Sequence, residues 1–376
     1  MRWALLAFSI FCFHSVQAEV IKVGIFHHLH VNSVSVSVID GTYELFKNDR
    51  LVHTYKAGEK LRFTYNSGGV LLNSVNYSGS ASTKFELIAK TSSCELKASP
   101  KGNSVTRKLT GHLSFWNRGR AMSIINTLDL DVYITGVVEA ESGSKQNEEY
   151  YKVQAVICRT YALSNKFKHA KSGFHLCDEV HCQVYKGISE SNPDIISATM
   201  KTSDVVVVDE DINLITAAFH SNCGGHTINS EDVWSQAVPY LKAVPDTFCV
   251  DMPHSTWERS VKQVNFMGFL KKQGVSAHLD SMALFTPDTR VTHYQEKLHI
   301  KDIRAKFNLW STLFSVNRQD DTFLISGKGF GHGVGLCQEG AMKMSQLGYS
   351  YISILHHYFT DIHVVPLSNF HLFQEN

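Results

Sequence analysis

The stretch "DLDVYITGVVEAESGSKQNEEYYKVQAVICRTYALSNKF", residues 129–167, carries two helical patterns on either side of a polar turn. Glu148 and Glu149 open the second pattern, where acidic side chains favour the start of a helix. Its apolar residues recur at helical spacing at Val153, Val156, Ile157, Thr160, Leu163 and Phe167. If residues 130–141 also form a helix, Glu139 and Glu141 project about 200° apart. Only one of these two carboxylates can then face a given site.

The chain before this stretch has a different period. Short alternating apolar runs, separated by Gly, Asn and Asp turns, extend from Glu19 to about Asn126. Such runs are typical of antiparallel strands. We therefore predict an α+β fold, with a β-rich N-terminal domain over residues 19–110 and a mixed region over residues 111–370. Two short helices over 336–348 and 350–359, and a hairpin joining 204–208 to 213–219, are expected within the mixed region.

The first eighteen residues are typical of an export signal. Arg2 precedes an apolar run from Trp3 to Phe13, and Val16-Gln17-Ala18 has the small-x-small pattern of a cleavage site. The run is too short for a membrane-spanning helix, which needs roughly 20 apolar residues. We expect residues 1–18 to be removed, leaving an exported protein without a stable membrane span.

The charge balance and the cysteines limit the function classes. The chain has 36 Lys and Arg against 35 Asp and Glu. It therefore lacks the basic excess that is typical of a nucleic-acid binder. Cys12 is one of eight cysteines and falls in the export signal, which leaves an odd number that cannot all pair. Some of the remaining cysteines must be free thiols or metal ligands.

The segment "HLCDEVHCQVYKG", residues 175–187, is a candidate metal loop. It places Cys177, His181 and Cys182 within six residues, with His175 and His169 close by. Zinc is bound tetrahedrally by such thiolates and imidazoles. The alternative from spacing alone is a small-loop disulfide between the two cysteines.

Two glycine-containing segments are further candidates. In "SGKGFGHGVGLCQEG", residues 326–340, no Gly-Lys-Ser/Thr follows the glycines, which argues against a phosphate loop. The alternating glycines instead allow close backbone approach, with His332 lining a groove. In "AFHSNCGGHT", residues 218–227, Cys223 is either a nucleophile beside a histidine or a thiol that is packed under the turn or paired with Cys249.

Five ordered motifs resemble the SpoIID/LytB family of bacterial cell-wall proteins. They are "LTGHLSFWNRGRAMSIINTLDLDVYITGVVEAES", "KVQAVICRTYAL", "CDEVHCQVYKG", "AFHSNCGGHTINSEDVW" and "GKGFGHGVGLCQEGAMKMSQLGYSYISILHHYF", spread over residues 110–363. The resemblance is weak over 255–320, which fits an insertion. The family pattern Gly-Val-Val-x-x-Glu falls on Glu141, whereas Ser142-Gly143 stand where the family usually has Met-Pro.

The resemblance implies a lytic transglycosylase. In that reaction the sugar's own 6-hydroxyl attacks the anomeric carbon, so a single Glu141 can serve as acid and then as base. The acid needs a raised pKa, which apolar Ile134, Val137 and Val138 beside it would supply by desolvation. One rival is a modifier protein that enhances a wall amidase without cutting glycan. Another is a muramidase with a second carboxylate, such as Asp178 or Glu148.

The resemblance also implies ligands and partners. It supports a structural zinc ion on Cys177, His181 and Cys182, with His169, His175 or water as the fourth ligand. The expected substrate is peptidoglycan glycan strands stripped of stem peptides, in the periplasm or cell envelope and in cooperation with an amidase. The polar residues expected to bind the strand are Arg159, Tyr161, Gln183, Tyr185, His220, Ser221, His332 and Gln338. Trp234 is as consistent with a core residue as with a sugar-stacking one.

Overall fold

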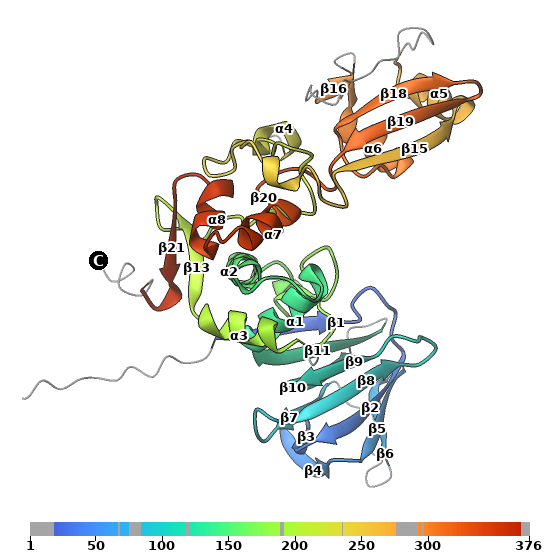
Figure 1. Ribbon diagram of the computed structural model, residues 1–376. Helices are drawn as coiled ribbons and strands as arrows, with labels where there is room; N and C mark the ends of the chain where they lie inside the picture. Colours follow the sequence, from blue (N-terminus) through green and yellow to red (C-terminus); the bar gives the residue numbers. More distant parts are fainter. Residues whose placement is uncertain are drawn as a thin grey trace, which may run out of the picture.

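The computed structural model describes residues 19–66, 68–74, 84–117, 121–188, 192–234, 236–275, 292–294 and 297–369. The predicted export signal lies outside these residues. Figure 1 shows three parts: a β-rich part, a central part built mainly of helices, and an outer part of strands and helices. No helix among the described residues is long and apolar enough to cross a membrane. The predicted α+β class is confirmed.

The β-rich part is a sandwich of two largely antiparallel sheets. One has the order β12-β1-β11-β10-β7-β3-β4 and the other the order β6-β5-β2-β8-β9. The strands of the first sheet are β1 (Val20–Ile25), β3 (Thr42–Lys47), β4 (Arg50–Lys56), β7 (Lys84–Ala89), β10 (His112–Asn117), β11 (Met122–Asp129) and β12 (Leu176–Cys177). Those of the second are β2 (Ser33–Asp40), β5 (Lys60–Asn66), β6 (Gly69–Ser74), β8 (Glu95–Pro100) and β9 (Arg107–Thr110).

Alternating burial along the strands explains why these two sheets pack face to face. In "SVSVSV" of β2, every valine is buried and every serine is partly exposed, as expected for a strand with one face in the core. The aromatic ring of Phe63 on β5 stacks on that of Phe115 on β10, with centroids 3.7 Å apart. Period-2 patterning in the sequence therefore predicts this part correctly.

The larger sheet contains strands from both sides of residue 110, where we predicted a domain boundary. Strands β10 and β11 follow that residue and pair with β7 and β1. Strand β12 comes from still later in the chain and pairs with β1 in parallel. The candidate metal loop therefore begins at the edge of the sandwich.

The central part packs helices against short strand pairs. The predicted helices are confirmed at α1 (Leu130–Ser142), α2 (Glu148–Ser164), α7 (Gln338–Gln346) and α8 (Tyr351–Tyr358). Asp129 caps α1 by accepting from the Asp131 and Val132 N–H groups, and Ser350 caps α8 as expected. The remaining elements are α3 (Pro193–Lys201), α4 (Ser230–Trp234), η1 (Ala170–Ser172), η2 (Thr247–Cys249), η4 (Leu367–Asn369), β13 (Val205–Asp209), β14 (Phe219–His220), β20 (Leu336–Cys337) and β21 (Ile362–Pro366).

The predicted hairpin is confirmed as a short reversal after β13. Val208 forms an antiparallel bridge with Leu214, and the Ile215 N–H donates to the Val207 carbonyl. The full ladder partner of β13, however, is β21, from the far end of the chain. Strand β14 pairs in parallel with β20. Local patterning cannot reveal such pairings, because they join segments far apart in sequence.

The outer part has a hydrophobic core of its own. Trp257, Phe266 and Phe323 belong to this second cluster of buried residues, separate from the large core shared by the sandwich and the centre. Its elements are β15 (Thr256–Lys262), α5 (Gln263–Lys272), β16 (His293–Tyr294), β17 (Leu298–His299), α6 (Ile300–Phe307), β18 (Phe314–Gln319) and β19 (Thr322–Lys328). This unit coincides with the segment in which the family resemblance is weak.

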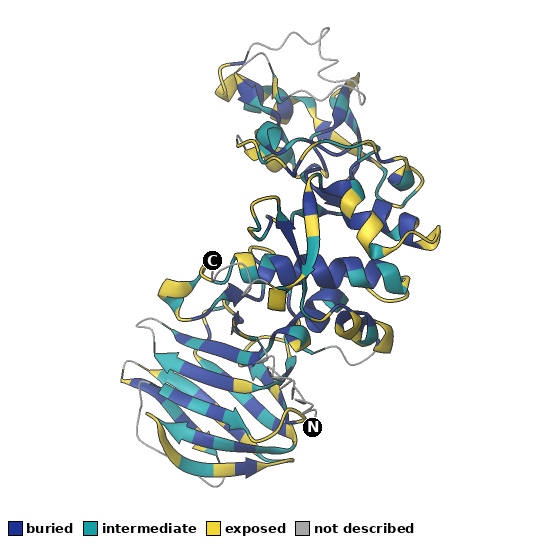
Figure 2. Ribbon diagram, turned by 90° about the vertical axis from the view of Figure 1, so that its left-hand side faces the viewer, coloured by how far each residue is buried: buried dark blue, intermediate teal, exposed yellow. Residues whose placement is uncertain are grey.

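Figure 2 shows that the helices of the central part are largely buried. In α1 the buried residues include Gly136 and Val137. At Gly136, a Cβ atom would collide with the carbonyl oxygen of Gly187 and with the ring of Tyr185. Glycine at 136 is therefore required by close packing, although it is a poor helix former.

We expect Gly136→Ala to destabilise the protein by about 1–3 kcal/mol, the usual cost of overpacking, despite the better helix propensity of alanine. Gly268→Ala in α5 is the matched control, because no atom lies within 4 Å of the Cβ it would add. That variant should gain about 0.5–1 kcal/mol. Urea unfolding of both variants measures the difference, and equal effects would refute the packing argument.

Candidate functional site

Glu141 lies at the last turn of α1 and is half-buried. The backbone N–H of Val184 donates to its Oε1 at 2.9 Å. Burial raises the pKa of Glu141 above its ordinary value, while the Val184 hydrogen bond and the Lys186 charge partly oppose the shift. The structure thus gives this carboxyl the property that a general acid needs.

The segment that carries Val184 is held by buried side chains. Gln183 Nε2 donates to the Cys158 carbonyl of α2 at 3.2 Å, and Tyr133 Oη of α1 donates to Gln183 Oε1. Tyr185 is fully buried, and its hydroxyl donates to Asn126 Oδ1 on β11. Gln183 and Tyr185, predicted to bind substrate, therefore lie inside the fold and fix the backbone beside Glu141.

Arg159 is also committed to internal contacts. Its Nε and Nη2 donate to Asp131 Oδ1 at 2.9 and 2.6 Å, and its Nη1 donates to the Val205 carbonyl. Only 1% of the side chain surface is exposed. This arginine ties α1 and α2 to β13. Tyr161 of the same motif is partly exposed, with Lys168 Nζ donating to its hydroxyl at 3.1 Å.

Four donor atoms converge at the candidate metal loop. The Cys182 Sγ lies 3.3 Å from His169 Nε2 and 3.6 Å from His181 Nδ1, and the Cys177 Sγ lies 3.8 Å from that same nitrogen. All four donors lie within 4.8 Å of one another. Sulfur and nitrogen ligands of one tetrahedral zinc are separated by about 3.5 Å, given bonds of ~2.3 and ~2.0 Å. The set fits zinc.

The geometry favours His169 as the fourth ligand. His169 follows α2 and contributes its Nε2 to the group. His175 instead accepts a hydrogen bond from the Lys22 N–H on β1, outside the group. A hydrogen bond from the Cys182 thiol lowers the pKa of Cys177, which favours the thiolate, the form that binds metals.

A second group of predicted residues gathers where β14 meets β20. His332 contacts His220 and Trp234, with ring centroids 5.4 and 5.6 Å apart. Burial lowers the pKa of His332 to about 4, so its imidazole is neutral near pH 7. Ser221 and Gln338 lie on the adjoining loop and helix start. Among the described contacts of Glu141, none involves this group.

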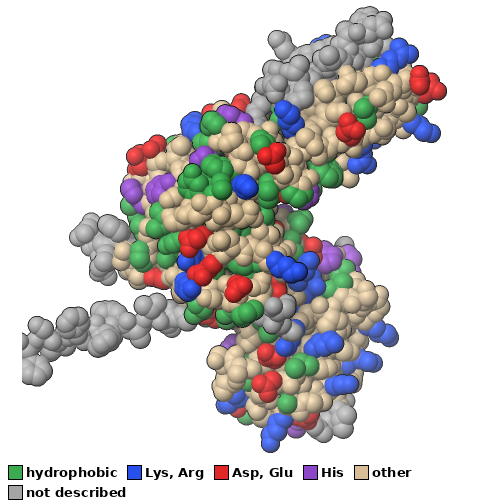
Figure 3. Space-filling model, in the orientation of Figure 1, with side chains coloured by type: hydrophobic (Ala, Val, Ile, Leu, Met, Phe, Trp, Pro, Cys, Tyr) green, Lys and Arg blue, Asp and Glu red, His purple; other side chains and the backbone are tan. Residues whose placement is uncertain are grey.

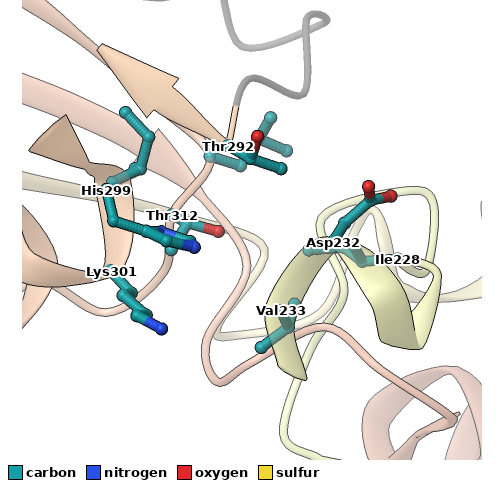
Figure 4. A pocket seen from close by; sticks show the side chains of 9 residues that line it. Ile228, Asp232, Val233, Thr292, His299, Lys301 and Thr312 are labelled. Atoms are coloured by element: carbon teal, nitrogen blue, oxygen red, sulfur yellow. The ribbon is translucent and has the colours of Figure 1, made fainter. Parts of the chain in front are cut away.

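A pocket opens between α4 and the outer part (Figure 4). Ile228, Asp232 and Val233 line one side. The other side is lined by residues of the outer part that include Thr292, His299, Lys301 and Thr312. Sequence patterning did not indicate this pocket, because its walls lie more than fifty residues apart in the chain.

Comparison with known proteins identifies relatives of this chain. The family model described as "SpoIID: Stage II sporulation protein" matches residues 118–208, which contain both Glu141 and the metal loop. An uncharacterised protein of Brachyspira hyodysenteriae is 30% identical over 265 residues, covering 68% of this chain and 72% of its own. The stage II sporulation protein D of Bacillus amyloliquefaciens is 30% identical over 270 residues, covering 65% and 77%.

The chain therefore belongs to the SpoIID family. It is also similar to a Bacillus subtilis protein named amidase enhancer, at 28% identity over 286 residues, covering 60% of this chain and 39% of that protein.

We expect His169→Gln to weaken zinc binding at least about tenfold, because a lost ligand costs no less than a lost supporting contact. His175→Gln is the control, since His175 lies outside the ligand group. Titration against a chromogenic zinc chelator measures both affinities. A greater loss of zinc affinity in His175→Gln than in His169→Gln would show that His175 is the ligand instead.

The raised pKa of Glu141 predicts how stability depends on pH. The folded state holds this proton more tightly than the unfolded state, so stability falls as pH rises from the unfolded pKa of about 4.3 through the folded one. Glu141→Gln removes that cost and keeps an oxygen for the Val184 N–H. Its melting temperature should exceed wild type at neutral pH, and the gain should vanish below pH ~4. A gain that is independent of pH would contradict this account.

Proposed function

We propose that the protein is a lytic transglycosylase that cleaves peptidoglycan glycan strands through Glu141. The observation that carries the proposal is the half-buried Glu141 carboxyl, whose pKa is raised by burial and whose Oε1 accepts from the Val184 N–H. A carboxyl with this pKa retains its proton at a higher pH than an exposed one. It can then protonate a leaving oxygen.

The reaction needs two proton transfers and no water. Glu141 donates its proton to the glycosidic oxygen as the bond from that oxygen to the anomeric carbon breaks. The 6-hydroxyl oxygen of the same sugar attacks the anomeric carbon, and the Glu141 carboxylate takes up the hydroxyl proton. The products are a 1,6-anhydro end and a free 4-hydroxyl end, and Glu141 is again protonated.

The alternative of a two-carboxylate muramidase needs a second acid, for which Asp178 and Glu148 were the named candidates. Asp178 is 1% exposed and accepts from the Phe26 N–H at 2.9 Å, with Arg107 at 3.9 Å, so it holds the turn after β1. Glu148 forms ion pairs with Lys152 and Lys201. Both carboxylates named as candidates have other partners, which supports a reaction that needs only Glu141.

Zinc would be held by His169, Cys177, His181 and Cys182 and would act as a structural cross-link. The loop it closes leads directly into Gln183 and Val184, so the ion would order the backbone that donates to Glu141. All four ligand positions are taken by protein groups, which is typical of structural rather than catalytic zinc.

The glycan strand would bind across exposed and half-buried polar groups of the central part. Tyr161, Ser221, His332 and Gln338 are the predicted strand-binding residues that retain partial exposure, and Trp234 is exposed. Figure 3 shows the surface hollowed on one side, between the sandwich and the rest of the molecule. We propose that the protein meets this strand in the periplasm or cell envelope, after export and after an amidase has removed the stem peptides.

A second function is favoured by one relative. The protein named amidase enhancer suggests a modifier that stimulates a wall amidase without cutting glycan. Ser142-Gly143, where the family usually has Met-Pro, changes the turn that follows the acid: Gly143 has a φ of 67°, which no proline can adopt.

Mass spectrometry of amidase-treated glycan strands distinguishes these functions. Wild type should release anhydro-ended fragments, and Glu141→Gln should lose at least about 100-fold in rate, the contribution of general acid catalysis. Glu139→Gln, on the other side of the same helix, should retain activity. Reducing ends would identify a hydrolase, while intact strands with a stimulated amidase would identify the modifier.

A further inference from the structure

A second group of potential metal ligands lies away from Glu141 in the central part. Cys223 follows β14, Asp246 precedes η2, Cys249 ends η2, and Cys337 ends β20. One donor atom from each of these residues lies within 4.8 Å of all the others. All four residues are buried, with Asp246, Cys249 and Cys337 fully so. We propose that they form a second zinc site with three sulfur ligands and one oxygen ligand.

The distances suit one tetrahedral ion. The Cys223 Sγ lies 3.4 Å from the Cys249 Sγ and 3.3 Å from Asp246 Oδ2. Ligands of a tetrahedral zinc are separated by about 3.7 Å for two sulfurs and about 3.5 Å for sulfur and oxygen, given bonds of ~2.3 and ~2.0 Å. Both distances from the Cys223 Sγ are therefore within a few tenths of an ångström of the separations around a zinc ion.

Neighbouring groups hold these ligands in a metal-ready arrangement. Tyr358 Oη donates to Asp246 Oδ2 at 2.9 Å, and the Phe248 N–H donates to Oδ1 at 3.0 Å. The Cys337 Sγ accepts from the N–H groups of Cys223 and Gly340 at 3.3 and 3.4 Å. Such supporting bonds orient the ligands of metal sites. Cys337 is also the N-cap of α7, so its sulfur is held at the start of that helix.

Burial makes a cation the natural partner of this group. A buried carboxylate beside three thiols is costly unless a positive charge compensates it. Gly340 permits the approach, since a Cβ there would collide with Asp246 and with the Tyr358 hydroxyl. A divalent ion bound by thiolates would compensate the carboxylate in place, without any Lys or Arg in the ligand set.

The ion would cross-link the loops that carry the predicted strand-binding residues. His220 and Ser221 lie three and two residues before Cys223 along the chain, and His332 and Gln338 flank the segment that ends at Cys337. The ligands span residues 223–337 and lie on both sides of the outer part, which begins at β15 and ends at β19. One ion would therefore close the base from which that part projects (Figure 1).

The competing chemistry for these residues is a disulfide between Cys223 and Cys249. It would consume two of the three sulfurs and bring them to about 2.05 Å. Cys337 and Asp246 would then no longer bind a metal ion together with these two sulfurs. The two chemistries predict different metal contents and different masses, so they can be separated directly.

The test measures the metal content of a double variant, Cys177→Ser/Cys182→Ser, in which the candidate metal loop cannot bind zinc. The zinc in the purified variant is quantified by inductively coupled plasma mass spectrometry. Cobalt then replaces the zinc for spectroscopy. We expect one zinc per chain, against two in wild type, and a visible cobalt spectrum with thiolate charge transfer. This outcome does not depend on glycan cleavage, so it stands or falls apart from the proposed enzymatic activity.

Two further substitutions, each added to the double variant, test the proposed ligands one at a time. Asp246→Asn preserves shape but supplies a poor ligand, and it should lower zinc affinity at least about tenfold, with an unchanged far-ultraviolet circular dichroism spectrum. Cys249→Ser should remove about a third of the charge-transfer intensity in any chain that retains cobalt. Absence of zinc and cobalt in the folded double variant, or a Cys223–Cys249 disulfide in its non-reducing peptide map, would overturn the proposal.

Discussion

The close approach of α1 to the backbone at Gly187 is the constraint on which the rest of the structure depends. Neither Gly136 nor Gly187 has a side chain, so the Gly187 carbonyl can lie directly against the helix. Gly187 also bridges to Lys108 of β9 at a φ of 111°. A chain of contacts thus runs from the helix through one short segment to the sandwich. Any Cβ at either glycine would push these layers apart.

The position of Glu141 follows from this contact. The helix is fixed at Gly136, and Val184 lies three residues before Gly187, so the Val184 N–H and the last turn of α1 meet. The candidate zinc loop ends at Cys182, immediately before the same segment. The loop, the backbone donor and the acid therefore form one continuous unit. The buried Arg159–Asp131 pair fixes the opposite end of α1 by joining it to α2.

Sequence patterning reached the local features and missed those that join distant segments. Period-2 runs such as residues 33–38 and helical spacing over 148–164 depend on one burial face, so both were predicted correctly. Arg159, Gln183, Tyr185 and His220 were expected on a glycan-binding surface but are buried. A motif does not reveal which side a polar residue faces. The Cys223 group was missed because its ligands come from three separated loops.

The two proposed functions place different demands on Glu141. Holding a carboxyl partly out of water disfavours its charged form, which lowers stability at neutral pH. The Val184 N–H and the Lys186 charge stabilise the carboxylate, but they offset only part of this loss of stability. A protein that merely stimulates an amidase gains nothing from this arrangement, since an exposed glutamate would fold more easily. A general acid requires it, because the proton must still be present when the glycosidic oxygen leaves. The local loss of stability is the feature of this site that the proposed catalytic role would account for.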